Sequence, residues 1–278
     1  MDVIVDIHTH VFPPETIANR DAYLAADETF RELYADPKAK LATADDLLAS
    51  MDAAGIDISV ALGFAWTDDV TVRLHNDYLL QFGASSGGRI VPFCTLPLAS
   101  DDEGIEREMR RCAEGGARGF GELRPDNLRF DAAGERGERL ATLAREMDVT
   151  LLFHASEPVG HSYPGKDGGG IGALYRFLSA NEGTKVILAH LGGGLPFYAH
   201  MPEVRRAIEG VGFDTAACGY LYEAPAYAMV AASSLLFGSD FPLITQTRAR
   251  RELEAALSPE LHAAALGDNA ARWLGLTP

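Results

Sequence analysis

Short apolar runs alternate with amphipathic segments along most of the chain. The runs are nearly continuous in their apolar character, which is typical of parallel strands covered on both faces. We expect eight of them to be strands: Val3–His10, Ser59–Phe64, Ile90–Leu96, Gly119–Leu123, Thr150–Ala155, Lys185–Leu191, Gly212–Thr215 and Leu235–Asp240. Helical spacing of apolar residues predicts helices between them, over Ala44–Ala53, Asp69–Gln81, Asp102–Ala113, Arg136–Glu146, Gly172–Ala180 and Pro202–Ala207.

This alternation predicts a single (β/α)8 barrel over residues 1–278. Eight strand–helix units in about 250 residues are typical of that barrel, whereas a doubly wound sheet usually has fewer strands at this length. The longest departure from regular spacing is Val11–Thr43, which includes a short predicted helix around Phe30–Tyr34. We expect this insertion after the first strand to be a lid. The closing segment Gly267–Leu274 predicts a helix at the bottom of the barrel.

Composition narrows the class of protein. With 47% hydrophobic residues in 278, the chain can bury one large core. Its 40 acidic and 24 basic residues give a net charge of −16, which argues against a nucleic-acid partner. Cys94, Cys112 and Cys218 are scattered and are expected to be reduced thiols. The sequence shows no basic n-region and no apolar stretch of about 18 residues, so we expect no signal peptide, no membrane contact and a cytoplasmic location.

Histidines and one aspartate stand at the ends of four predicted strands: His8 and His10, His154, His190, and Asp240. The two-residue period of a strand places His8 and His10 on one face, within reach of one ion. This pair is the sharpest local signal, although two histidines in isolation are about as often structural, and a single histidine after an apolar run is more often structural. However, the carboxyl ends of barrel strands all meet at one mouth, where catalytic groups lie. The set therefore predicts one functional site.

These motifs resemble the amidohydrolase superfamily, and within it the group that includes aminocarboxymuconate-semialdehyde decarboxylase, resorcylate decarboxylases and pyrone-dicarboxylate lactonase. The resemblance extends from the Asp6–His10 motif to Gly238–Pro242 and the closing Gly267–Leu276. It implies a divalent ion, usually zinc although manganese is also accepted, held by His8, His10, His154 and Asp240. It further implies Asp240 as the general acid and base for a metal-activated water. His190 would orient that water, polarise the substrate carbonyl, or bind a second ion.

The fourth predicted strand departs from the best-known pattern of the superfamily. Many binuclear relatives carry a carboxylated lysine there, whereas this chain has Glu122. TatD-like nucleases of the superfamily use a glutamate at this place, so Glu122 is a candidate ligand of one or two ions. The alternative is a supporting role, in which Glu122 fixes a histidine ring or a substrate hydroxyl. Both interpretations stay open at this point.

Basic residues are predicted near the same mouth. Arg124 follows Glu122 by two residues and therefore points the same way, where it could hold a substrate carboxylate through two hydrogen bonds. The loop Ser156–Gly170 adds His161 and Lys166. We expect a local pocket for an anionic small molecule. The alternative is a solvated loop whose basic residues have no such role.

The leading hypothesis is a metal-dependent hydrolase of a small carbonyl substrate, namely a lactone, a cyclic amide or an ester. The alternative is a nonoxidative decarboxylase of an aromatic or unsaturated carboxylic acid, because the resembled group performs both reactions on nearly the same ligands. A TatD-like nuclease is supported by Glu122 and opposed by the net charge. A non-catalytic metal-binding barrel is opposed by the complete set of predicted ligands. Dimerisation is common in the resembled group, so a homodimer is one of its implications.

Overall fold

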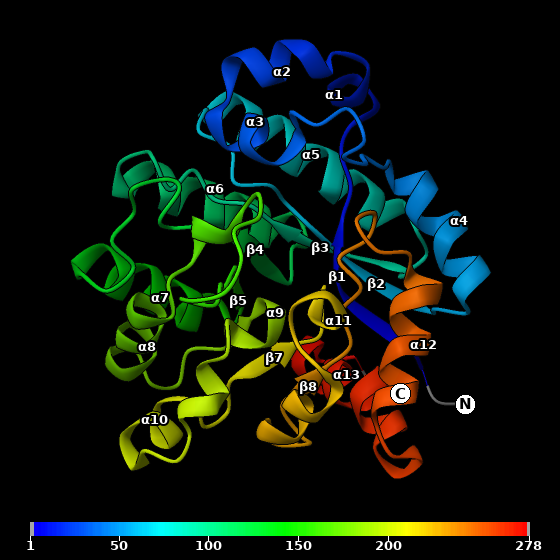
Figure 1. The fold of residues 1–278 in the computed structure, drawn as a ribbon. Coiled ribbons are helices and arrows are strands. Elements are labelled where there is room, and N and C mark those ends of the chain that lie inside the picture. The colour runs from blue at the N-terminus through cyan, green and yellow to red at the C-terminus, as the bar shows by residue number, and fades with distance from the viewer. Residues whose placement is uncertain (1–2, 277–278) are drawn as a thin grey trace.

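The protein folds as a (β/α)8 barrel, as predicted (Figure 1). The computed structural model describes residues 3–276, apart from the side chains of residues 167, 220 and 224. The parallel strands follow one another in chain order: β1 (Val5–His10), β2 (Ile58–Leu62), β3 (Ile90–Cys94), β4 (Gly119–Leu123), β5 (Thr150–Phe153), β6 (Val186–Leu188), β7 (Gly212–Asp214) and β8 (Leu235–Leu236). The two ends of the sheet meet where the Ile7 amide donates to the Phe237 carbonyl and Thr9 bridges to Phe241.

Helices cover the outside of the barrel and close one end of it (Figure 1). Those that alternate with strands are α4 (Ala44–Ala54), α5 (Asp69–Ser85), α6 (Asp102–Glu114), α7 (Glu135–Met147), α8 (Ile171–Ala180), α9 (Ala189–Gly192), α10 (Pro202–Ala207), α11 (Cys218–Leu221), α12 (Gln246–Ala256) and α13 (Asn269–Leu274). Shorter turns are η1 (Lys166–Gly168), η2 (Leu195–Tyr198), η3 (Ala224–Met229), η4 (Pro259–Leu261) and the π-helical η5 (Ala264–Asp268). All six predicted helices are present. None of the helices in residues 3–276 is long and apolar enough to span a membrane.

Several strands end earlier than the apolar pattern predicts, and the difference is largest for the sixth and the eighth. The sixth predicted strand extends to Leu191 and the eighth to Asp240, yet β6 ends at Leu188 and β8 at Leu236. His190 and Asp240 have φ angles of 53° and 62°, in the left-handed region that a strand cannot contain. Both side chains therefore lie on tight turns that leave the strands.

One end of the barrel is closed by α13. Alternating strand residues such as Ile7, Leu62 and Leu152 form a buried cluster with Ala270 and Leu274 of this helix. Layers of inward-facing aliphatic side chains of this kind fill the interior of such barrels. The predicted helix at the bottom is thus confirmed, and the carboxyl ends of the strands form the opposite end of the barrel.

The segment after β1 holds three helices instead of the single short one predicted: α1 (Pro14–Ala18), α2 (Arg20–Ala26) and α3 (Glu28–Tyr34). They lie together beside α5 (Figure 1). Aromatic rings join α3 to the ends of β1 and β2, with Phe30 stacked on Trp66 at 5.1 Å and perpendicular to Phe12 at 5.9 Å. His75 of α5 accepts a hydrogen bond from Trp66 and donates to the Val11 carbonyl. That this segment is a lid stays a prediction.

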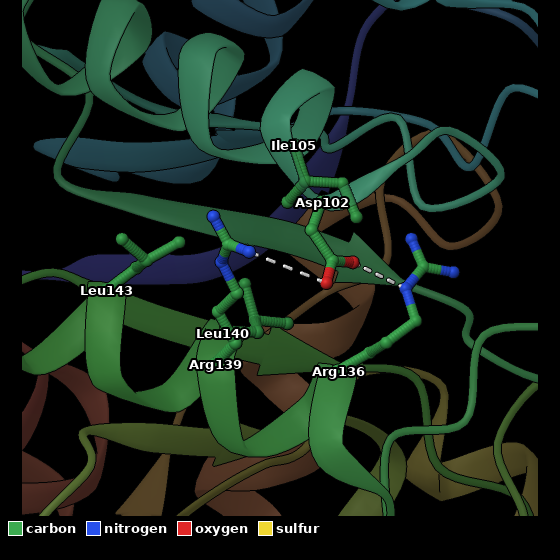
Figure 2. A pocket seen from close by; sticks show the side chains of 6 residues that line it. All are labelled: Asp102, Ile105, Arg136, Arg139, Leu140 and Leu143. Atoms are coloured by element: carbon green, nitrogen blue, oxygen red, sulfur yellow. Dashed lines mark hydrogen bonds and ion pairs between the residues drawn. The ribbon is translucent and has the colours of Figure 1, made fainter.

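A surface depression of about 190 Å³, open solvent included, lies between α6 and α7 (Figure 2). Its polar edge is an ion-pair group in which Asp102 lies 2.6 Å from Arg136 Nε and 3.7 Å from Arg139 Nη1. Its charges are thus already paired. None of the residues that line it is a predicted site residue.

Candidate metal centre

Six predicted residues meet at the carboxyl ends of the strands. They form three overlapping groups whose ligand atoms lie within 4.8 Å of one another: His8, His10 and Glu122; His8, His190 and Asp240; and Glu122, His154 and His190. The four histidines and Glu122 are each at most 9% exposed. The convergence expected from the barrel is therefore present, and it includes Glu122.

Glu122 lies between the histidines. Its Oε1 is 2.8 Å from His154 Nδ1, 3.2 Å from His190 Nε2 and 4.0 Å from His8 Nε2. Its Oε2 is 3.8 Å from His10 Nε2. Because one carboxylate reaches all four rings, it can serve as a ligand of a single ion or be shared between two. The contact with His154 Nδ1 is equally compatible with the alternative role, in which Glu122 holds the His154 ring in place.

The outward-facing nitrogens of three rings have hydrogen-bond partners. His8 Nδ1 is 2.8 Å from Asp214 Oδ2, and His190 Nδ1 is 2.9 Å from the Ala216 carbonyl. His154 Nε2 is 2.9 Å from Ser156 Oγ. The opposite nitrogen of each ring faces the centre.

This pattern is the one that metal-binding histidines show, since their second nitrogen is nearly always held by a carboxylate, carbonyl or similar group. Inward imidazole nitrogens and carboxylate oxygens suit zinc or manganese. The residues present thus fit a divalent cation. Sequence reasoning missed Asp214 and Ser156 as partners of these rings.

The charges of the centre favour a bound cation. Burial lowers the pKa of His8, but the charge and hydrogen bond of Asp214, together with Glu122 and Asp240, raise it to about 10. Burial likewise lowers the pKa of His190, and its hydrogen bond to Glu122 and the charge of that carboxylate raise it to about 9. The carboxylates therefore hold protons on two rings in the absence of a metal. A divalent ion would replace these positive charges.

Asp240 lies on the turn after β8. Its backbone amide donates to the His8 carbonyl, and its Oδ1 is 3.5 Å from His10 Nε2 and 3.7 Å from His8 Nε2. The preceding turn is fixed by the buried Asp6, which accepts hydrogen bonds from the Ser239 amide and from Gln246. The first acid of the Asp6–His10 motif thus helps to place Asp240, the last candidate ligand of the set.

Arg124 belongs to a closed ring of four hydrogen bonds. Its Nε donates to Asn127 Oδ1 at 3.0 Å, and its Nη2 donates to the Gly165 carbonyl at 2.7 Å. Asn127 Nδ2 and the Gly165 amide donate in turn to the two oxygens of Glu32, at 2.9 and 3.0 Å. The ring joins the end of β4, the loop after β5 and helix α3. It fixes the guanidinium next to the centre, and Glu32 and Asn127 were not predicted from the sequence.

The other two basic residues lie in the loop after β5. Lys166 Nζ donates to the Val159 and His161 carbonyls and is 3.4 Å from Glu157 Oε1, so its charge is compensated within the loop. His161 is exposed, with its ring 5.6 Å from that of Tyr163. Substrate binding by either residue stays a prediction.

Solved structures of the same fold cover nearly the whole chain. A 5-carboxyvanillate decarboxylase from Sphingomonas paucimobilis has a TM-score of 0.77 and 16% identity, with 100% of both chains covered. A 2,6-dihydroxybenzoate decarboxylase from Rhizobium has a TM-score of 0.75 and 18% identity, with 99% of both chains covered. A dihydroxybenzoic acid decarboxylase from Polaromonas, with bound manganese and the inhibitor 2-nitroresorcinol, has a TM-score of 0.74 and 18% identity and covers 99% of this chain and 98% of its own. At these identities the likeness concerns the fold.

Among the curated proteins, none matches the chain. The family model described as amidohydrolase matches residues 5–276. That range contains every strand of the barrel and all six residues of the candidate metal centre. The chain therefore belongs to the amidohydrolase family of metal-dependent enzymes.

Proposed function

We propose that the protein is a metal-dependent carboxy-lyase that removes a carboxylate from an aromatic or unsaturated acid without oxidation. The main support is that three solved structures matching the chain over nearly its full length are decarboxylases of hydroxylated aromatic acids. They favour this alternative over the hydrolysis of a lactone, cyclic amide or ester that the sequence placed first. The buried histidines and carboxylates described above suit either reaction.

His8, His10, His154 and Asp240 would hold the ion, with Glu122 as a further ligand and His190 as a ligand of a second ion or a substrate contact. Zinc and manganese both suit these donors, and manganese is bound in the Polaromonas structure. When bound, the ion would act as a Lewis acid that draws electron density from a substrate oxygen.

Asp240 is the proposed proton donor. Its carboxyl would give a proton to the carbon that bears the substrate carboxylate. The bond between this carbon and the carboxylate then breaks, its electron pair stays with the carbon skeleton, and carbon dioxide leaves. The Asp240 side chain is 13% exposed, so the resulting carboxylate can take its next proton from water.

Arg124 is the proposed contact for an anionic group of the substrate. A guanidinium that is held in place before binding loses little side-chain entropy when the ligand arrives. Its planar donors match a carboxylate geometrically. His161 and Lys166 are proposed to add positive charge at the edge of the same site.

The test is a substrate panel with the metal-loaded protein. Carbon dioxide release is measured from ortho-hydroxybenzoates and muconate-type acids, while lactones, cyclic amides and esters are followed with a pH indicator. We expect carbon dioxide and the protonated product in equal amounts, and loss of both after chelation. Lactone or ester opening without carbon dioxide would instead establish hydrolysis. Single-stranded DNA is included in the panel to test the nuclease alternative. Inactivity of the fully metal-loaded protein on every compound would contradict the proposal.

A further inference from the structure

We infer that Asp214, at the end of β7, is a positioning residue that sets the proton on His8 and the backbone of His190, and thereby the affinity of the centre for its metal. β7 contributes none of the six candidate ligands. The inference rests on the proposed metal centre and is independent of the reaction catalysed there.

Asp214 touches two of the candidate ligands with one carboxylate. It is fully buried, with 0% of its surface exposed. Its Oδ2 lies 2.8 Å from His8 Nδ1, and its Oδ1 accepts hydrogen bonds from the amides of His190, at 2.9 Å, and Ala216, at 3.0 Å. Three N–H donors thus converge on two oxygens.

The contact with His8 decides which ring nitrogen is available to a cation. An ionised carboxylate only accepts hydrogen bonds, so His8 Nδ1 must carry its proton. The lone pair that becomes free is therefore on Nε2, which faces His10 Nε2 at 3.0 Å and Asp240 Oδ1 at 3.7 Å. Asp214 thus turns the binding nitrogen of His8 toward the centre.

The second oxygen acts on His190 in two ways. It accepts from the amide of His190, whose φ of 53° and ψ of 50° lie in the left-handed region that is unfavourable for residues other than glycine. It also holds the amide of Ala216, the residue whose carbonyl lies 2.9 Å from His190 Nδ1. The same carboxylate therefore orients both the backbone and, through Ala216, the ring of His190.

An amide cannot replace this carboxylate. Asparagine has the shape of aspartate but only one accepting atom, and its NH2 group donates. If the NH2 group faced His8, Nδ1 would need a lone pair and the proton would move to Nε2, where a metal must bind. If the NH2 group faced His190 and Ala216, two backbone donors would lose their acceptor. Loss of such a partner typically weakens metal binding about 10- to 100-fold.

Asp27 offers a matched control for a purely structural effect. It is also buried and also accepts from three donors, the Phe30 amide at 2.8 Å and the amide and hydroxyl of Thr67 at 2.7 Å. None of these donors is a histidine. Asp27→Asn therefore removes comparable hydrogen bonding without a direct contact to the centre.

The experiment compares the full-length wild type with Asp214→Asn and Asp27→Asn. Each protein is first stripped of metal and is then titrated with Zn2+ or Mn2+ in the presence of a competing chelator. Circular dichroism and thermal denaturation of the stripped proteins report folding. We expect Asp214→Asn to bind about 10- to 100-fold more weakly than the wild type, and Asp27→Asn to bind as the wild type does. Equal binding by Asp214→Asn, or an equal loss in Asp27→Asn, would overturn the inference.

A second measurement holds even if Asp214→Asn fails to fold. In the metal-loaded wild type, the ring ¹⁵N resonances of His8 should show the proton on Nδ1, and a proton on Nε2 would refute the assignment. Failure of the wild type to bind either metal would overturn the proposed centre together with this inference. Normal wild-type binding with an unaffected Asp214→Asn would overturn only the role of Asp214.

Discussion

Glu32 should hold helix α3 and the loop after β5 together. Its two oxygens accept from the Gly165 amide at 3.0 Å and from Asn127 Nδ2 at 2.9 Å. Glu32→Ala removes both contacts and opens the ring that includes Arg124. If the segment that carries Glu32 is a lid, this change should favour its open state.

The size of the effect follows from the two contacts. A hydrogen bond to a charged group contributes about 1.5 to 3 kcal/mol when it is shielded from water. Glu32 is exposed, and exposed charged contacts contribute only about 0.2 to 1 kcal/mol each. Because the Gly165 contact is partly buried, we expect a total of about 1 to 2 kcal/mol, which is about a 5- to 30-fold change in the opening equilibrium.

Hydrogen exchange at the Gly165 amide measures this equilibrium directly, because that amide is the donor to Glu32. We expect Glu32→Ala to accelerate exchange by the factor given above, and Glu32→Gln to have a smaller effect because glutamine keeps one acceptor. Glu28→Gln is the control: Glu28 lies on the same helix, and none of its described contacts reaches the loop. Unchanged exchange at Gly165 in Glu32→Ala, or equal acceleration in Glu28→Gln, would refute the reasoning.

Three further predictions concern the centre and its surroundings. Because the pKa values of His8 and His190 lie at about 10 and 9, both rings hold protons at pH 7 that a metal must displace, so metal affinity should rise between pH 6 and 9. The rise should be about tenfold per pH unit for each proton released, and a titration series in which affinity falls with pH would contradict this. Asp240→Asn should slow turnover at least about 100-fold, measured at equal metal content. Trp66→Phe leaves the buried His75 Nδ1 without its donor and should lower the free energy of unfolding by about 1 to 3 kcal/mol, as measured by denaturation.

The sequence was sufficient to predict the barrel and the convergence of His8, His10, His154, His190 and Asp240. The reason is geometric: in a closed parallel barrel, the polar residue that follows each apolar run reaches the same rim. The turns of His190 and Asp240 could not be predicted, because the apolar pattern continues through residues whose φ is positive. The spacing of apolar residues indicates which positions are buried, but it does not indicate the sign of a backbone dihedral angle.

Asp214 was missed because β7 is only three residues long and its predicted run continued to Thr215. An acid at the end of a strand is the same signal that identified Asp240, so the rule could have found it. The ring of Glu32, Asn127 and Gly165 is different, since 133 positions separate Glu32 from Gly165 and no local pattern relates them. The reaction itself could not be decided, because hydrolases and decarboxylases of the resembled group use nearly the same ligands.

The hydrogen-bond ring also bears on how specificity could diverge in this barrel. Each of its three segments supplies an atom that another segment needs. Gly165 contacts Glu32 and Arg124 through its own amide and carbonyl, at a φ of 88° and with no space for a Cβ beside Leu33, so a foreign loop at residues 156–170 would need a glycine in the same place to keep these contacts. Exchange of residues 11–43 alone would remove the Glu32 carboxylate, which accepts from Asn127 and from the Gly165 amide. The two segments therefore depend on each other, and a library that exchanges them as a pair should retain more members with this hydrogen-bond ring intact than one that exchanges them separately.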